Sequence, residues 1–543
     1  MKAGRLLLCF ALLTGCTMKN EADIILRNAK IYTVDEDFSV AEAIAIKDGK
    51  ILAIGGTRDV LDDYTAARII DVRAQAIYPG FIDAHCHFVG YGLSLTQVDL
   101  KGTTSFESVL TRVQEHAAGT TGWITGRGWD HNDWEVKEFP ARFALDSLFP
   151  DRPVLLKRID GHAALANKHA LDLANLTIGS LVAGGTVEVK DGVLTGLLID
   201  NAIDLVTSII PGPTEEEYSA AIRTAEQRCL AVGLTTVDDA GLDLGVVSLL
   251  NKMHKEGTLK MKVYAMLNPS KENFGHFAEM GPLLTDRLTV RSFKFYADGA
   301  LGSRGAALKQ PYSDDPENTG LFLNELEYLE KKAAVIYRMD FQMNTHCIGD
   351  SGNQLILDLY GKVLEGTNDK RWRIEHAQVV DLEDISKFGQ YNIIPSVQPT
   401  HCTSDMYWAE DRLGADRMAG AYAYRTLLEQ NGMIAGGSDF PIEGINPLLG
   451  FYAAVERKDL QGYPKNGFQT DDAITRKQAL KAMTIWAAIA NFEEDKKGSL
   501  KPGKDADLVI LDTDIMTESL DSIQSVKVLG TFINGEQVYD GGL

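Results

Sequence analysis

Short apolar segments alternate with longer stretches of helical periodicity through the middle of the chain, from residue 79 to residue 496. This alternation is typical of a parallel β/α architecture, because each buried strand is followed by a helix that covers the sheet. The strand candidates are FIDAH ending at His85, LTTVDD at 234–239, KVYAML at 262–267, VRSFKF at 290–295, FQMNTH ending at His346, WRIEH ending at His376, NIIPSV at 392–397 and MIAGGSD ending at Asp439. Eight such units predict a TIM (β/α)8 barrel.

The two ends of the chain share a second pattern, in which apolar and polar residues alternate between turn signals. Residues 22–78 contain such runs separated by Asp-Gly and Gly-Gly pairs, and residues 497–543 repeat the style and include the hairpin signal Asn534-Gly535. Alternation of this kind is typical of strands and hairpins. We therefore expect residues 22–78 plus 497–543 to form one composite β-sandwich.

The interval between the first and second strand candidates, from His87 to Leu234, is longer than a single crossover needs. It predicts a subdomain of about residues 100–215 inserted after the first barrel strand. The insert holds Trp123, Trp129 and Trp134.

The N-terminus has the features of a secretory signal. Lys2 and Arg5 precede the apolar run Leu6 to Leu13, which is too short to span a bilayer. The sequence Leu-Thr-Gly-Cys ending at Cys16 resembles the lipobox of bacterial lipoproteins, in which the cysteine is acylated. We expect a lipoprotein signal peptide over residues 1–16 and a lipid anchor in the bacterial cell envelope, on the periplasmic or surface side. A generic secretory signal is the alternative.

Composition and charge narrow the class of protein. With 45% hydrophobic and 24% charged residues, the chain of 543 residues has the composition of a globular protein. Its formal net charge of −22 becomes −24 when Lys2 and Arg5 leave with the signal, which argues against a nucleic-acid partner. The wide spacing of the remaining cysteines shows no disulfide framework.

Polar residues at the ends of the predicted strands indicate a metal site. His85 and His87 are two residues apart, so a strand places both imidazoles on one face. The full set of strand-end candidates is His85, His87, Lys294, His346, His376 and Asp439. In a TIM barrel these ends face one mouth. Histidines packed in the core are the alternative, but six residues of ligand type at such ends favour a metal site.

Several longer motifs carry a resemblance to a known family. They are PGFIDAHCH at 79–87, KFYADGALGSRGA at 294–306, NTHCIGD at 344–350, RIEHA at 373–377, GGSDFP at 436–441 and KPGKDADLVILD at 501–512. On these motifs the chain resembles the amidohydrolase superfamily, and within it the amidohydrolase 3 branch of N-substituted formamide deformylase-like enzymes. The resemblance covers nearly everything after the signal, and it is much more specific for the family than for the substrate.

The resemblance implies one or two divalent metal ions, most often zinc, ligated or flanked by His85, His87, His346, His376 and Asp439. Neutral imidazole and carboxylate suit that ion. An ammonium group has no lone pair for a metal. In many relatives the lysine that matches Lys294 is carboxylated by CO2, which makes it an anion able to bridge two metals. An unmodified Lys294, paired with a carboxylate or contacting substrate, is the alternative and favours a single metal.

Asp439 has the clearest predicted chemical role. A carboxylate beside a metal-bound water accepts its proton and later passes it to the leaving nitrogen. His376 or His346 would then stabilise the oxyanion together with the metal. A helix N-cap in the Gly-Gly-Ser-Asp turn is the alternative for Asp439.

Candidates for substrate binding are weaker. They are His162 in the insert, Asp298 in the glycine-rich loop after Lys294, and Trp129, for which packing inside the insert is the favoured alternative. For His162 the alternative is helix capping or packing in the core. For Asp298, and for Arg304 in the same loop, the alternative is closing a turn. Cys86 is expected to be a buried structural thiol, and His401 has no motif partner.

The sequence therefore predicts a metal-dependent hydrolase that uses metal-activated hydroxide to cleave a carbon–nitrogen amide-type bond of a small molecule, namely an N-formyl, N-acyl or cyclic amide. One alternative is hydrolysis of a dipeptide-like compound or an N-acyl amino acid. Another is a surface lipoprotein that binds a ligand without turnover. An oligomer is compatible with the sequence, which fixes neither the oligomeric state nor the substrate nor the metal.

Overall fold

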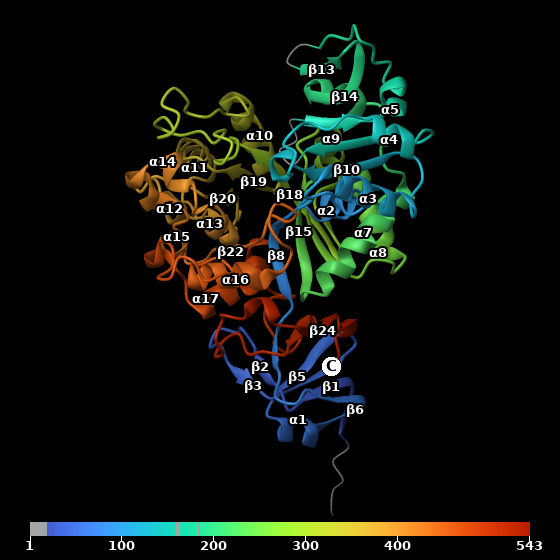
Figure 1. The fold of residues 1–543 in the computed structure, drawn as a ribbon. Coiled ribbons are helices and arrows are strands. Elements are labelled where there is room, and N and C mark those ends of the chain that lie inside the picture. The colour runs from blue at the N-terminus through green and yellow to red at the C-terminus, as the bar shows by residue number, and fades with distance from the viewer. Residues whose placement is uncertain (1–18, 159–162, 183–184) are drawn as a thin grey trace, which may run out of the picture. The chain divides into compact units, whose positions relative to one another are not determined.

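The computed structural model describes residues 19–158, 163–182 and 185–543, and these divide into two compact units. The barrel unit comprises the described part of residues 1–86 together with residues 229–244 and 260–543. The insert unit comprises the described part of residues 87–228 together with residues 245–259. Figure 1 shows the elements of both.

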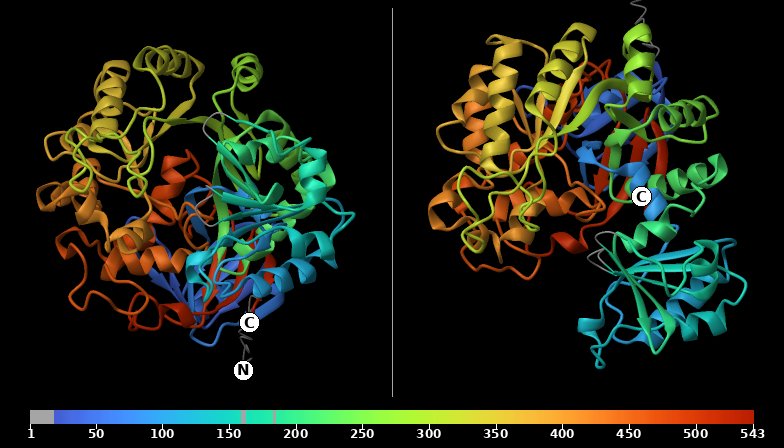
Figure 2. Two further views of the ribbon diagram at one scale, coloured as in Figure 1. Left: turned by 45° about the horizontal axis from the view of Figure 1, so that its top comes forward. Right: turned by 90° about the horizontal axis from the view of Figure 1, so that it is seen from above.

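Parallel strands in chain order form the centre of the barrel unit (Figure 2). They are β8 (Phe81–Cys86), β15 (Leu234–Leu242), β16 (Lys262–Leu267), β18 (Leu288–Tyr296), β19 (Gln342–Cys347), β20 (Arg373–His376), β21 (Ile394–Val397) and β22 (Ala435–Gly436). A short strand, β17 (Leu283–Leu284), pairs antiparallel with β18. These eight parallel strands make a nearly closed barrel, so the predicted TIM-barrel fold is confirmed.

The last barrel strand is shorter than the sequence pattern indicated. β22 ends at Gly436, because the chain then turns against β8: a Cβ at Gly437 would lie 2.5 Å from the backbone nitrogen of His85. Two residues later the backbone N–H of Asp439 donates to the carbonyl oxygen of His85 over 2.7 Å. This contact places Asp439 beside the end of the first barrel strand.

Helices follow the barrel strands within the barrel unit. They are α9 (Lys271–Met280), α10 (Leu326–Met339), α11 (Asp350–Leu364), α12 (Ser386–Gln390), α13 (Pro399–Asp405), α14 (Ala409–Leu413), α15 (Tyr424–Asn431), α16 (Pro447–Glu456), α17 (Arg476–Ala482) and α18 (Ile485–Ala490). Strand ends and helix starts therefore alternate around the barrel, as the sequence periodicity predicted.

Both chain ends contribute to a β-sandwich in the barrel unit. One sheet has the order β25-β24-β23-β7-β2-β3 and joins β2 (Lys30–Tyr32), β3 (Val40–Ala41) and β7 (Ala76–Pro79) to β23 (Leu508–Leu511), β24 (Val528–Ile533) and β25 (Glu536–Asp540). The other, of order β5-β4-β1-β6, contains β1 (Asn20–Arg27), β4 (Ala43–Lys47), β5 (Lys50–Gly55) and β6 (Tyr64–Asp71), with α1 (Thr57–Asp63) between the last two. Antiparallel pairing of β23 with β7 joins the two ends, so the predicted composite sandwich is confirmed.

A buried ion cluster joins this sandwich to the barrel. Lys262, the first residue of β16, is fully buried, and its Nζ lies 2.7 Å from Asp505 and 2.7 Å from Asp507. The two carboxylates precede β23 of the sandwich. A buried cation with two anionic partners has its charge compensated, whereas removing either side would leave an unpaired buried charge.

The insert unit has a sheet of its own, in the order β13-β14-β12-β11-β10-β9. Its strands are β9 (Val98–Asp99), β10 (Ile124–Trp129), β11 (Val154–Arg158), β12 (Ala163–Ala166), β13 (Gly185–Lys190) and β14 (Val193–Asp200). Its helices are α2 (Phe88–Ser94), α3 (Phe106–Ala117), α4 (Phe143–Leu148), α5 (Lys168–Leu173), α6 (Ala202–Thr207) and most of α7 (Glu215–Leu230) and α8 (Leu244–Lys255). The predicted insertion after the first barrel strand is confirmed, while its exact limits stay a prediction.

Within the described ranges, no helix combines the length and apolar character that crossing a membrane requires.

Candidate metal centre

Three imidazoles from three barrel strands come together at the strand ends, those of His85 and His376 buried and that of His346 13% exposed. His85 lies on β8, His346 on β19, and His376 is the last residue of β20. The ring centroids of His85 and His376 are 5.0 Å apart, and those of His346 and His376 are 4.5 Å apart. Residues distant in sequence therefore form one cluster, as expected for strand ends that face one mouth.

His85, His87 and Asp439 form a group with the spacing of a metal site. Each offers one ligand atom, and these atoms lie within 4.8 Å of one another. The Nε2 atom of His85 is 3.7 Å from Oδ1 of Asp439. Imidazole nitrogen with carboxylate oxygen is a donor set that zinc accepts, so the residues present fit a divalent ion.

The orientation of His85 is set from behind by Glu375. The Nδ1 atom of His85 lies 2.6 Å from Oε2 of Glu375, and both side chains are fully buried. A carboxylate in this position accepts the Nδ1 proton, which leaves the Nε2 lone pair directed at the site. Burial alone would raise the pKa of Glu375, but the charge of Arg373, with help from His85, outweighs it and holds that pKa below its usual value.

Arg373 in turn fixes Glu375 from the barrel interior. Its guanidinium is fully buried and pairs with Glu375 at 2.7 Å and with Asp238 of β15 at 3.0 Å. It also donates to the hydroxyl of Ser396 on β21 over 3.0 Å and to the carbonyl oxygen of Ala84 on β8. Arg373, itself on β20, thus links β8, β15 and β21 to its own strand, next to the imidazole cluster.

His376 is held in a similar way by Gln398, the residue that follows β21. The Nδ1 atom of His376 is 2.6 Å from Oε1 of Gln398. An amide oxygen only accepts, so Nδ1 carries the proton and Nε2 is left with a lone pair. The backbone of His376 has a φ of 74° and that of Asp439 a φ of 61°. Left-handed backbone at residues other than glycine is strained and concentrates at functional sites.

The histidines of the cluster are uncharged at neutral pH. Burial lowers the pKa of His85 to about 4 and that of His346 to about 3, and the nearby charge of Lys294 acts in the same direction. Burial, followed by the neighbouring His346, also lowers the pKa of His376 well below its usual value. Neutral imidazole is the form that binds a metal.

Lys294 lies within the same cluster. Its Nζ atom is 3.1 Å from Nε2 of His85, and the side chain is buried beneath the ring of Tyr296, whose centroid lies 4.9 Å away. Burial lowers the pKa of Lys294 to about 8. An unmodified amine at this place would contact the nitrogen that His85 presents to a metal.

Asp83 is a residue of the site that the sequence analysis missed. Its carboxylate accepts the backbone N–H of His85 at 3.2 Å and both the backbone N–H and the hydroxyl of Ser438, at 2.9 and 2.6 Å. It therefore fixes the segment that carries Asp439. Burial raises the pKa of Asp83 to about 7. The available signal was the strand period of two, which puts Asp83 on the same face as His85.

Asp298 has a different environment from the one expected of a substrate contact. Its fully buried carboxylate accepts the backbone N–H groups of Ala307, Ile348 and Gly349, at 2.9, 3.0 and 2.7 Å. Its Oδ1 atom lies 3.7 Å from Nε2 of His346. The structure thus favours a role in holding the loop beside His346 over direct contact with substrate.

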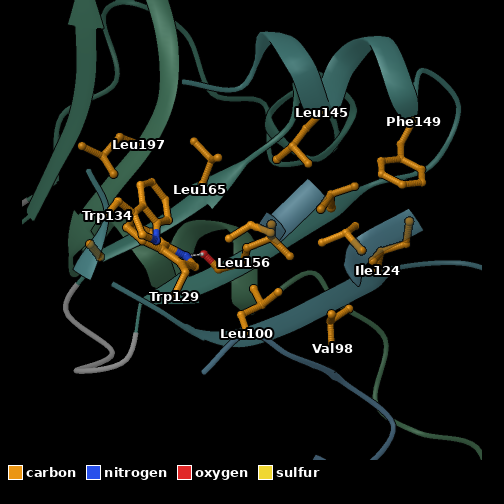
Figure 3. Close-up of a cluster of buried hydrophobic side chains, with 14 residues drawn as sticks. Val98, Leu100, Ile124, Trp129, Trp134, Leu145, Phe149, Leu156, Leu165 and Leu197 are labelled. Atoms are coloured by element: carbon orange, nitrogen blue, oxygen red, sulfur yellow. Dashed lines mark hydrogen bonds between the residues drawn. The ribbon is translucent and has the colours of Figure 1, made fainter. Parts of the chain in front are cut away.

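The remaining sequence candidates either have other partners or lie outside the described residues. Trp129 is 1% exposed in the core of the insert unit, and its indole N–H donates to Leu156 over 2.8 Å, which favours the packing alternative (Figure 3). Arg304 pairs with Asp314 at the surface of the barrel unit. Cys86 is buried and unbridged, as expected. His162 and Cys16 lie outside the described residues.

The fold and the site define a metal-dependent hydrolase built on a TIM barrel. The chain belongs to the amidohydrolase family, whose model matches residues 68–539. The predicted family and enzyme class are thereby confirmed.

Relatives in this family match almost the whole chain. The chain is 33% identical to the putative amidohydrolase YtcJ of Bacillus subtilis (strain 168) over 519 residues, covering 94% of this chain and 98% of that protein. It is 24% identical to the N-substituted formamide deformylase of Arthrobacter pascens over 550 residues, covering 96% and 99%. The crystal structure of an uncharacterised metal-dependent hydrolase from Pyrococcus furiosus superposes with a TM-score of 0.78 at 28% identity, covering 91% of this chain and 100% of that one.

Replacing Glu375 with Gln is expected to weaken zinc binding by about 10- to 100-fold, because the partner that orients a ligating histidine would lose its charge. Competition with a chromophoric chelator measures this affinity. Glu365→Gln, at the exposed C-terminal end of α11, is the matched control and should leave zinc binding unchanged. Equal zinc affinity in the Glu375 variant and the wild type would refute this role for Glu375.

Proposed function

We propose that the protein hydrolyses a carbon–nitrogen amide-type bond of a small molecule, an N-formyl, N-acyl or cyclic amide, at a zinc centre held by His85, His87 and Asp439 with His346 and His376 beside them. The observation that carries the proposal is the group of His85, His87 and Asp439, whose ligand atoms lie within 4.8 Å of one another, with Oδ1 of Asp439 3.7 Å from Nε2 of His85. A protein that only binds a ligand has no evident need for such a set. The formamide deformylase among the relatives supports the choice of bond.

Bound divalent zinc would polarise the substrate carbonyl and lower the pKa of water toward about 7. Asp439 is the residue that takes a proton from the attacking water, because its carboxylate lies at the strand-end mouth. As the new carbon–oxygen bond forms and the carbon–nitrogen bond breaks, Asp439 delivers that proton to the leaving nitrogen. The products are an amine and a carboxylic acid, which loses its proton to solvent and becomes a carboxylate.

The hydrogen bonds of His376 and His346 support metal binding by both residues more than hydrogen-bond donation to an oxyanion. His376 presents a lone pair at Nε2, because Gln398 accepts its Nδ1 proton. His346 has Nε2 3.4 Å from the carbonyl oxygen of Gly299, which makes Nε2 the protonated nitrogen and leaves the lone pair on Nδ1. This pattern supports ligand roles for both and leaves less support for His376 as an oxyanion donor.

Lys294 fits this centre best as a carbamate. Its pKa of about 8 increases the share of neutral amine, the form that attacks CO2. In that reaction a nitrogen–carbon bond forms, the amine proton goes to solvent, and an anionic carboxylate group results. The change would replace a cation 3.1 Å from the ligating nitrogen of His85 with an oxygen ligand and allow a second metal.

We also propose a lipid anchor at Cys16 that holds the protein to the bacterial envelope. The support is the sequence alone: Lys2 and Arg5, the apolar run Leu6 to Leu13, and the lipobox-like Leu-Thr-Gly-Cys.

Asp439→Asn is expected to lower kcat/KM by about 10²- to 10⁴-fold, because an amide cannot accept the proton of water. The assay uses zinc-loaded protein with N-formyl amines, N-acyl amino acids, dipeptides and cyclic amides. Asp471→Asn, at an exposed position, is the control and should retain wild-type activity. Wild-type protein that cleaves none of these compounds would rule out the proposed function.

Isotope-labelled bicarbonate should give a carbamate signal by NMR in the wild type and none in Lys294→Met. The bound-metal count should fall by one ion per chain in the same variant, because a bridging oxygen is lost. Lys271→Met, exposed on α9, should keep both the signal and the count. Wild-type protein with no carbamate and one metal would favour the ammonium alternative.

Cys16→Ser is expected to move the protein from the detergent phase to the aqueous phase on Triton X-114 partition of expressing bacteria. The cause is loss of the acylated thiol. Cys229→Ser is the control, because this cysteine is buried in the fold. A wild-type protein found in the aqueous phase would contradict the anchor.

A further inference from the structure

His401, which the sequence left without a partner, lies at the metal centre. It is the third residue of α13, the helix that follows β21, and its side chain is 12% exposed. The ring stacks on that of His376 with centroids 5.9 Å apart and an interplanar angle of 24°. The seventh barrel strand therefore contributes to the site through the helix behind it.

The two oxygens of Asp439 have different neighbours. Oδ1 lies 3.7 Å from Nε2 of His85, on the side of the metal ligands. Oδ2 lies 3.9 Å from Nε2 of His401. The carboxylate is thus situated between a metal-ligating histidine and a histidine that takes no part in the ligand set.

The separation of 3.9 Å is too long for a direct hydrogen bond. A third atom between Nε2 of His401 and Oδ2 of Asp439 could hydrogen-bond to both, at about 2.8 Å from each. The Nε2 atom of His401 is buried and makes no hydrogen bond with any residue that the structure describes. A buried polar atom in this state is open to a partner that binds at the site.

We propose that His401 is a further catalytic residue, which accepts a hydrogen bond from the N–H of the scissile amide while Asp439 faces the same nitrogen. This inference rests on the proposed function and deepens it. It assigns the leaving-group side of the substrate to α13, and it names the substrate class as amides that carry a hydrogen on nitrogen, R–CO–NH–R′.

The roles of the two residues are complementary at the nitrogen. When water has added to the carbonyl carbon, the nitrogen has one lone pair and one N–H. The protonated Asp439 meets the lone pair, and His401 meets the N–H. The carbon–nitrogen bond then breaks as the proton moves from Asp439 to nitrogen, which releases a primary amine R′–NH2, and His401 neither gains nor loses a proton. An N-methylated amide lacks the N–H and cannot make the contact with His401.

A comparison of paired substrates tests this geometry. His401→Ala is expected to lower kcat/KM for an N-formyl derivative of a primary amine by about 10- to 100-fold, the range of one lost hydrogen bond in a buried site. For the matching N-methyl formamide the loss should be less than about threefold, because that substrate never makes the hydrogen bond. His401→Gln, which keeps an acceptor, should recover part of the activity on the first substrate alone. His276→Ala, exposed on α9, is the matched control and should change neither rate.

Two further measurements distinguish failure of this inference from failure of the proposed function. Zinc content should be the same in wild type and His401→Ala, and the primary amine product should bind the wild type about 10-fold more tightly than the variant in calorimetry. Equal losses on both substrates, loss of zinc in the variant, or equal amine binding would each overturn the role of His401. If the wild type cleaves no amide, the proposed function is overturned, and the amine-binding measurement still decides whether His401 faces an amine.

Discussion

The candidate metal centre depends on one buried guanidinium. Arg373 is fully buried and pairs with both Glu375 and Asp238. Its charge holds the pKa of Glu375 below its usual value, whereas burial still raises the pKa of Asp238 to about 7. Without it, two carboxylates would be left unpaired in a low-dielectric core, which is strongly destabilising. Because Glu375 stays anionic, it accepts the Nδ1 proton of His85 and directs Nε2 at the site. The tautomer of His85, a candidate metal ligand, is therefore set through Glu375 by the cation of Arg373.

The two ends of the barrel strands differ in how their buried ionisable groups are stabilised. At the start of β16, Lys262 pairs with Asp505 and Asp507, and Lys50 adds a second cation at Asp505, so barrel and sandwich are joined by paired charges. At the strand ends that carry the site, burial keeps histidines neutral and lowers the pKa of Lys294 to about 8. His376 and Asp439 there also have strained backbone. Stability is concentrated at one end and reactivity at the other, as is general for this fold.

The sequence predicted the barrel well because eight short apolar runs alternate with helical patterns, and several of these runs end in a polar residue. His85, His346 and His376 could be found in this way, since strand ends in a parallel barrel meet whatever their separation in sequence. Gln398 and His401 could not, because their contacts with His376 and Asp439 depend on how the chain turns after β21. For Asp83 and Glu375 the sequence offered only the alternation of side chains along a strand. Alternation indicates the face of the strand on which a side chain lies, but it does not identify the hydrogen-bond partner. The packing role of Trp129 follows from the insert's own core, which sequence spacing does not define.

The position of Asp439 depends on hydrogen bonds that join its segment of the chain to the first barrel strand. Its backbone N–H bonds to His85, and the preceding Ser438 is held through both its N–H and its hydroxyl by Asp83. The backbone that carries the carboxylate is thus fixed to β8, the strand that carries His85. A displacement of about 1 Å in such a group can lower a rate about 100-fold, so this fixing matters for chemistry as well as for fold. Asp439 has a strained φ of 61°, and in this conformation one carboxylate oxygen faces His85 and the other faces His401.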